Sequence, residues 1–171
     1  MSNTTHTGFC EKTKTIVLGI GNPILRDDGV GHRLIQELRS RVNNPHIVLE
    51  ETSAAGLDLM EILTGFDSAI IIDAIQGGGI PGTVHCLKPG DFCVANRDRY
   101  LQHGIGLLQA LELGERLGQP MPKEVTIVAI EARDTTNFGE GLTPDVERAI
   151  PLAVEKILHL LNSRQRPLSR A

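Results

Sequence analysis

Two aspartates and one histidine, far apart in the chain, have side chains of the types that can bind divalent metal ions. Asp28 follows a glycine-containing turn, Asp73 ends the apolar run SAIIID, and His103 precedes an amphipathic segment. Carboxylate oxygens and an imidazole nitrogen suit first-row divalent ions such as nickel, zinc or manganese. The three residues lie 45 and 30 positions apart, so only the fold can bring them together.

Each of these residues also has an ordinary structural explanation. Asp28 could cap the helix that follows it, Asp73 could cap a turn, and His103 could cap a helix or lie on the surface. A buried and unpaired carboxylate at Asp73 would be costly, which favours a function for that residue. Three further polar residues are interpreted as loop, packed or surface residues: Asp27, His32 and His85.

Apolar runs alternate with amphipathic segments along the chain, and together they predict the elements that position these residues. Strands are predicted over Thr15–Gly19, Ile47–Glu51, Ser68–Asp73, Thr83–Leu87 and Val125–Ile130. Helices are predicted over Val30–Val42, Leu57–Leu63, Gly104–Leu117 and Pro144–Leu161. Continuous apolar strands that alternate with such helices are typical of a mostly parallel sheet covered on both faces.

We therefore expect an α/β fold, a single three-layer domain of about five mostly parallel strands with helices on both faces. Ligands of such sheets bind outside the carboxyl ends of the strands, where Asp28, Asp73 and His103 are all expected. The domain is predicted to span residues 14–162. A loose N-terminal extension is expected over 1–13 and a disordered C-terminal tail over 163–171.

Composition excludes several classes of protein. The chain has 171 residues, a net charge of -4 and only five aromatic residues, which argues against nucleic-acid binding. No apolar run approaches the ~20 residues that span a membrane, and the polar N-terminus lacks the apolar stretch of a secretory signal. We expect a cytoplasmic protein without membrane contact. Three cysteines without a Cys-x-x-Cys pair argue against a disulfide framework or a thiolate zinc site.

Two glycine-containing segments could approach a ligand closely. The turn around Gly19 and Gly21 lacks the third glycine of a dinucleotide-binding fingerprint, but a small nucleotide- or phosphate-binding α/β domain is one alternative function. Asp27 and Asp28 argue against it, because they place negative charge where a phosphate would sit. The run Gly77–Gly79 predicts a flexible turn that would let another chain pass close to Asp73.

Four short motifs follow one another in the chain. They are IVLGIGNPILRDDGVG at Ile16–Gly31, IIDA at Ile71–Ala74 followed by GIPG at Gly79–Gly82, QHGIGLL at Gln102–Leu108, and FGEGLTP at Phe138–Pro144 with Val146. In this order they resemble the motifs of the hydrogenase maturation endopeptidases, and the likeness covers about residues 14 to 161.

The resemblance implies a phosphorylase/hydrolase-like fold and an endopeptidase that removes a C-terminal peptide from the precursor of a [NiFe] hydrogenase large subunit after nickel insertion. The family's two acids and one histidine map onto Asp28, Asp73 and His103, which would be both the catalytic residues and the nickel ligands. The precursor would supply the nickel, so the site stays empty until substrate arrives. The family has been classed with aspartic proteases and with metalloproteases. Water could therefore be activated by the metal as a Lewis acid or by a carboxylate as a general base.

The chain departs from the family pattern at three places. Asp28 stands where glutamate also occurs, and Gly104 stands where a glutamine often follows the histidine. The stretch Glu51–Gly56 replaces an Asp-Gly-Gly-Thr or similar segment linked to substrate matching, which leaves open which hydrogenase is served. We expect a monomer whose partner is the precursor. The second alternative is a non-catalytic hydrogenase maturation chaperone, against which the intact set of three residues counts.

Overall fold

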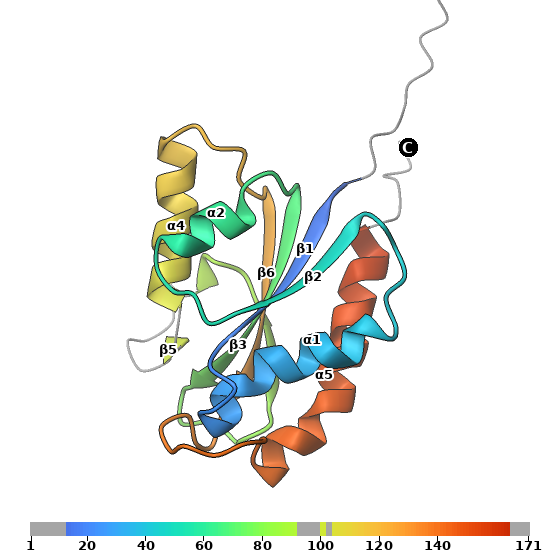
Figure 1. The fold of residues 1–171 in the computed structure, drawn as a ribbon, viewed down its shortest axis with the longest axis vertical. Helices are drawn as coiled ribbons and strands as arrows, with labels where there is room; N and C mark the ends of the chain where they lie inside the picture. The colour runs from blue at the N-terminus through green and yellow to red at the C-terminus, as the bar shows by residue number, and fades with distance from the viewer. Residues whose placement is uncertain (1–12, 92–99, 102–103, 165–171) are drawn as a thin grey trace, which may run out of the picture.

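The computed structural model describes residues 13–91, 100–101 and 104–164 (Figure 1). Its strands are β1 (Thr15–Ile20), β2 (Ile47–Thr52), β3 (Ser68–Gln76), β4 (Val84–Leu87), β5 (Tyr100–Leu101) and β6 (Glu124–Glu131). Its helices are a 3-10 helix η1 (Arg26–Gly29), then α1 (Val30–Arg39), α2 (Asp58–Leu63), α4 (Gly104–Arg116) and α5 (Pro144–Arg164).

The described strands form one six-stranded sheet in the order β2-β1-β3-β6-β4, with β5 paired to β3. The pairs β1–β2, β1–β3 and β3–β6 are parallel, whereas β4 pairs with β6 and β5 pairs with β3 in the antiparallel direction. The carboxyl ends of β1, β2, β3 and β6 therefore lie at the same end of the sheet, which we call the carboxyl end. It lies toward the bottom left of Figure 1.

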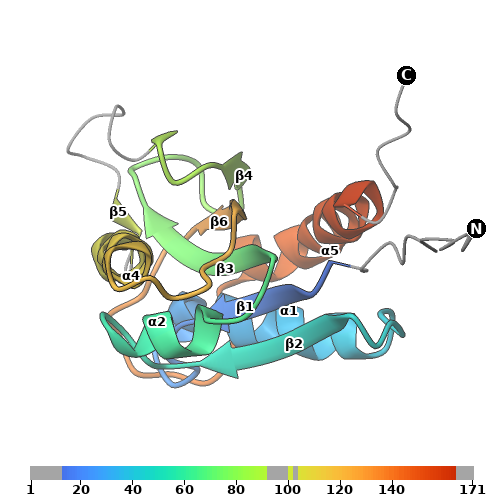
Figure 2. The same ribbon diagram turned by 90° about the horizontal axis from the view of Figure 1, so that it is seen from above.

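Two helices cover each face of the sheet, as Figure 2 shows. Helices α1 and α5 pack on one face, where Leu34 and Ile157 join Val17 and Ile70 in a first hydrophobic core. Helices α2 and α4 cover the other face and enclose a second core. The predicted three-layer α/β domain is thus confirmed, and its cores are built from aliphatic side chains that bury apolar area on both faces.

The predicted elements differ from the observed ones mainly at their ends. β3 continues to Gln76 instead of ending at Asp73, because Ala74 and Ile75 are apolar and keep pairing with β6. The sequence did not predict β5, whose two residues are too few to show a pattern. The closing helix reaches Arg164, so it includes two residues that the sequence assigned to the tail beginning at residue 163. None of the described helices is long and apolar enough to cross a membrane.

The turn from β1 into α1 depends on two glycines in direct contact. A Cβ atom on Gly31 would lie 2.5 Å from the carbonyl oxygen of Ile20, and one on Gly19 would lie 2.4 Å from the carbonyl oxygen of Gly31. Both contacts are with backbone, which cannot move aside as a flexible side chain can. The absence of side chains here lets α1 start directly against β1, and this sets the position of η1 and Asp28.

Asp27 ties the loop after β1 to the loop after β6. Its side chain is fully buried and accepts hydrogen bonds from the backbone N–H groups of Arg133 (2.9 Å), Asp134 (3.1 Å) and Thr143 (2.6 Å). It also accepts a bond of 2.8 Å from the Thr143 hydroxyl. The backbone N–H of Asp27 donates to the carbonyl oxygen of Asp134. The prediction that Asp27 is a structural loop residue is confirmed by these contacts.

Replacing Gly31 by alanine should destabilise the protein, because the new methyl group collides with the backbone of β1. We expect the free energy of unfolding to fall by about 2 kcal/mol, as overpacking of a close contact does. Urea denaturation measures the change. Gly90→Ala is the matched control, since a Cβ on Gly90 meets no atom within 4 Å. Equal stability of the two variants would contradict the contact.

Replacing Asp27 by alanine should be more disruptive, because three backbone N–H groups lose their acceptor, and that of Thr143 is buried. We expect a loss of about 3 kcal/mol or more in the free energy of unfolding. Asp58→Ala, at an exposed position of α2, should stay within about 0.5 kcal/mol of the wild type. Thermal unfolding followed by circular dichroism compares them, and an Asp27→Ala variant as stable as Asp58→Ala would refute the assignment.

Candidate active site

The chain leaves β1 and β3 toward opposite faces of the sheet. β1 lies between β2 and β3, and the chain runs from β1 into α1 on one face. The segment after β3 leads through β4 and β5 to α4, which covers the other face. In open α/β sheets, ligands bind where neighbouring strands send their connections in opposite directions. The carboxyl end between β1 and β3 is therefore the expected binding position.

Asp28 lies at this position in η1, where its side chain is 4% exposed. Its Oδ2 accepts a hydrogen bond of 2.7 Å from the backbone N–H of Asn22. Gly21 allows this close packing, since it has a φ of +139° and a Cβ there would lie 1.8 Å from the carbonyl oxygen of Asp28. The turn thus holds the Asp28 carboxylate in one place and leaves little of it open to water.

Asp73 approaches the same position from β3 and is 1% exposed. It alternates with Ile71 and Ile75, which belong to the core under α2 and α4, so its side chain is on that face of the sheet. It pairs in register with Ala129 of β6, and η1 contacts β3. The structure therefore places both predicted acids at the carboxyl end, although Asp73 lies three residues before the end of its strand.

His103 lies outside the described residues, so the third predicted ligand is not placed. The described residues on either side of it are Leu101, in β5, and Gly104, the first residue of α4. Leu101 pairs with Ile75, which is two residues beyond Asp73. Within residues 13–91, 100–101 and 104–164, no three His, Cys, Asp or Glu side chains are grouped to hold a metal ion.

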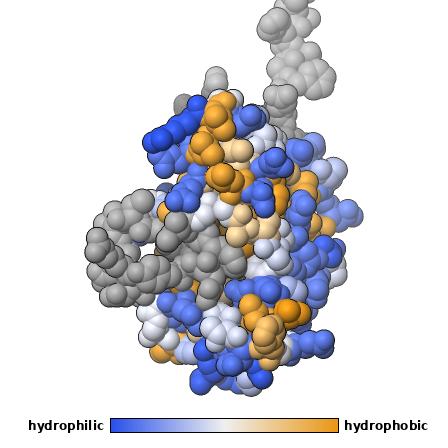
Figure 3. Space-filling view, turned by 60° about the vertical axis from the view of Figure 1, so that its left-hand side comes forward, coloured by the Kyte–Doolittle hydropathy of each residue, from blue (hydrophilic) through white to orange (hydrophobic). Residues whose placement is uncertain are grey.

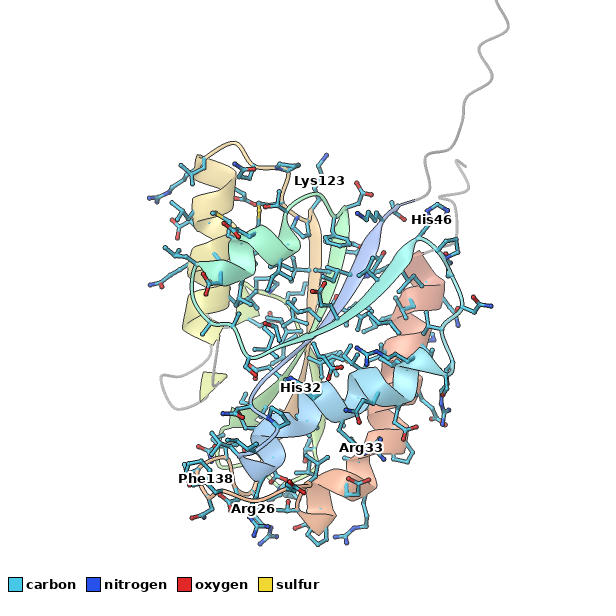
Figure 4. The ribbon with its side chains drawn as sticks, viewed as in Figure 1. Arg26, His32, Arg33, His46, Lys123 and Phe138 are labelled. Atoms are coloured by element: carbon cyan, nitrogen blue, oxygen red, sulfur yellow. The ribbon has the colours of Figure 1, made fainter. Side chains whose placement is uncertain are left out.

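His32 is a part-buried histidine on α1 that interacts electrostatically with Asp28. Burial lowers the pKa of its imidazole below the usual value, while the carboxylates of Glu51 and Asp28 act in the opposite direction. Its Nδ1 is buried without a hydrogen-bond partner in the part of the chain that the structure describes. Figure 4 shows His32 near the start of α1. The sequence allowed a surface position for His32, and in the structure this side chain is part-buried next to the candidate site.

In the loop after β1, the backbone N–H groups from Gly21 to Asp28 bind acceptors within the protein. Asn22 donates to Asp28, Arg26 to Gly139, and Asp27 to Asp134. The other non-proline residues of the loop also donate within the protein: Gly21, Ile24, Leu25 and Asp28. Phosphate sites of this type depend on free N–H groups at the start of a helix. The N–H groups of this loop therefore give no support to the phosphate-binding alternative.

The stretch Glu51–Gly56 begins at the end of β2, beside this loop. The resemblance links this stretch to the choice of substrate. Glu51 pairs with Arg39 of α1 at 2.7 Å. The hydroxyl of Ser53 donates a bond of 2.9 Å to the carbonyl oxygen of Gly21. A segment that differs from the family pattern thus borders the turn that holds Asp28.

Glu131 is a buried acid that the sequence reasoning missed. It ends β6, is 2% exposed, and accepts bonds of 2.7 and 2.8 Å from the backbone N–H groups of Gly77 and Gly79. His85 lies nearby, with its Nε2 atom 3.9 Å from Oε2 of Glu131. Glu131 ends the apolar run VTIVAIE as Asp73 ends SAIIID, so the same signal could have found it. The Gly77–Gly79 turn, predicted to be flexible, is held by this side chain.

Known proteins of one family resemble this chain in sequence and in structure. The family model of hydrogenase maturation proteases matches residues 32–160, a span that contains Asp73 and His103 and starts after Asp28. The chain is 30% identical over 150 residues to the hydrogenase 2 maturation protease of Escherichia coli (strain K12), covering 86% of this chain and 90% of the relative. It is 26% identical over 152 residues to the hydrogenase expression/formation protein HupD of Rhizobium leguminosarum bv. viciae, covering 88% and 75% of the two chains.

Solved structures agree with the sequence comparisons. The hydrogenase maturating endopeptidase HybD from E. coli superimposes with a TM-score of 0.73 at 30% identity, covering 88% of this chain and 93% of that one. A solution structure of an endopeptidase from Escherichia coli gives a TM-score of 0.75 at 29% identity over the same shares. The fold, the matched span and the identity over most of both chains lead to one conclusion: this chain belongs to the hydrogenase maturation protease family.

Proposed function

We propose that this protein removes a C-terminal peptide from the precursor of a [NiFe] hydrogenase large subunit once nickel has been inserted. Asp28, Asp73 and His103 bind the nickel that the precursor carries. Membership of the maturation protease family supports the reaction class. The observation that carries the site assignment is the burial of two acids, on two different elements, at the carboxyl end between β1 and β3.

The electrostatics of the site favour a divalent cation as the group that is recognised. Asp28 and Asp73 are at most 4% exposed and lie on η1 and β3, which contact each other. Two carboxylates that border one buried site repel each other, and a divalent cation between them would relieve that repulsion. A neutral imidazole from His103 would complete a mixed oxygen and nitrogen set, which suits nickel.

The chain's residues would then act mainly by positioning. Binding of the precursor's nickel places the peptide bond to be cut beside the same carboxylates. The contacts that recognise the substrate therefore also orient it for the reaction. Water attack follows, with the substrate's nickel as Lewis acid or a carboxylate as general base. Asp27 does not share in this chemistry, because both of its carboxylate oxygens accept hydrogen bonds from buried donors.

Variants of two proposed ligands should separate activity from folding. Asp73→Asn and His103→Ala should keep the wild-type circular dichroism spectrum but lose at least 100-fold in the rate of processing of a nickel-containing precursor, as removal of a group acting in catalysis typically does. Precursor shortening on a denaturing gel measures the rate.

The matched controls lie away from the site. Glu155→Gln changes an exposed acid on α5, and His46→Ala changes a histidine near the start of β2, at the other end of the sheet (Figure 4). Both should process precursor at the wild-type rate. Full activity in Asp73→Asn or His103→Ala would show that the site assignment is wrong.

Processing should depend on the nickel in the substrate and not on nickel added to the protease. Precursor purified from cells grown without nickel should remain whole when mixed with the protein, and precursor from nickel-supplied cells should be shortened. Mass spectrometry of the large subunit identifies the removed peptide. Equal cleavage of the two precursors would contradict a nickel-recognising role for Asp28, Asp73 and His103.

A further inference from the structure

Glu131 lies on the same face of the sheet as Asp73 and close to it in register. Asp73 pairs with Ala129, and Glu131 is two residues further along β6, so both acids are on the face covered by α4. His85 of β4 pairs with Ala129 from the other side. A buried carboxylate that takes no part in the proposed chemistry therefore stands beside the site.

This carboxylate fixes the segment that follows β3. Oε1 of Glu131 accepts the two bonds from Gly77 and Gly79, while the backbone carbonyl of Glu131 accepts a bond of 2.8 Å from Gly82. The backbone N–H of Glu131 donates to the carbonyl oxygen of Thr83 at 2.9 Å. The loop of residues 77–83 is thus tied to one residue at its beginning and at its end. Bonds to a carboxylate are stronger than neutral ones, so this restraint is substantial.

The restrained loop holds a large apolar side chain in water. Ile80 is 79% exposed, although neither the turn nor the core requires an isoleucine there. Ile24 and Phe138, at 52% and 79% exposure, lie on the loops after β1 and β6. These two loops are joined, because the N–H of Gly139 donates to the carbonyl oxygen of Ile24.

Each of the loops that follow β1, β3 and β6 therefore exposes an apolar side chain at the end of the sheet that holds Asp28 and Asp73. Figure 3 shows hydrophobic side chains at the lower end of the molecule, and Figure 4 places Phe138 beside Arg26 at that end. Apolar groups held in fixed positions on polar loops are typical of a surface that binds another protein. Such loops lose little conformational entropy when the partner binds.

We propose that Glu131 is a positioning residue for the substrate polypeptide. It holds the 77–83 loop as one wall of the site, so that Ile80 contacts the precursor next to the peptide bond beside Asp73. This role rests on the proposed function and adds to it the surface that the precursor's polypeptide meets. Glu131 touches neither the nickel nor the reacting atoms, so its effect is on binding and not on the chemical step.

Steady-state processing of the nickel-containing precursor by Ile80→Ser, Glu131→Ala and Glu131→Gln tests the proposal. Ile80→Ser should raise KM about tenfold with kcat unchanged, the loss expected when a large apolar contact is removed. Glu131→Ala should raise KM in the same way. Glu131→Gln should restore most of the wild-type KM, because the amide oxygen can still accept both glycine N–H bonds.

The matched control for Ile80→Ser is Leu117→Ser. Leu117 is 59% exposed and follows α4 at the opposite end of the molecule (Figure 1), so this variant should keep the wild-type KM. Thermal unfolding should show Ile80→Ser and Leu117→Ser to be as stable as the wild type. If Glu131→Ala fails to fold, the KM of Ile80→Ser still tests the proposal.

The outcomes separate the two proposals. A wild-type protein that leaves the precursor whole overturns the proposed function and this inference with it. A wild type that cuts the precursor, together with an Ile80→Ser variant of unchanged KM, overturns only the inference. A Glu131→Ala variant that lowers kcat and leaves KM alone also overturns it, since Glu131 would then act on the chemistry.

Discussion

The geometry of the candidate site depends on the hydrogen bonds that the carboxylate of Asp27 accepts. This carboxylate lies in the loop after β1 and binds the backbone of the loop after β6, including the residue directly before α5. A fully buried carboxylate is tolerated only when its oxygens are satisfied, and here three backbone N–H groups and one hydroxyl satisfy them. The next residue in the chain is Asp28. Its position is therefore set by a network that belongs to its neighbour.

The adjacent aspartates thus lie in different environments. Asp27 is directed into the protein, where its hydrogen bonds leave no capacity for a ligand. Asp28 accepts a single described bond, from Asn22, at the carboxyl end between β1 and β3. On the face of the sheet covered by α2 and α4, Glu131 has a similar structural task next to Asp73, since it holds a glycine loop. In both pairs, one acid organises the backbone beside an acid of the candidate site.

Much of the fold could be predicted from local pattern, whereas the networks could not. Aliphatic runs such as TIVLG and VTIVAI have no other stable place than the middle of a covered sheet, so β1 and β6 were predicted within two residues of their bounds. The chain order of these runs also predicted that Asp28 and Asp73 share one end of the sheet. The partners of Asp27 lie 106 to 116 positions away, and no local pattern contains such pairing. Likewise, β5 exists only because Ile75 and Gln76 are there to pair with it.

The same long separations govern when the site can form. A contact that closes a loop of more than 100 residues costs more chain entropy than a contact between neighbours in the sequence. During synthesis from the N-terminus, Asp28 emerges early, but Thr143 must follow before Asp27 has its full set of donors. A partly made chain therefore carries Asp28 and Asp73 without the contacts that fix their arrangement. The arrangement of the candidate site is therefore complete only when the domain is nearly complete.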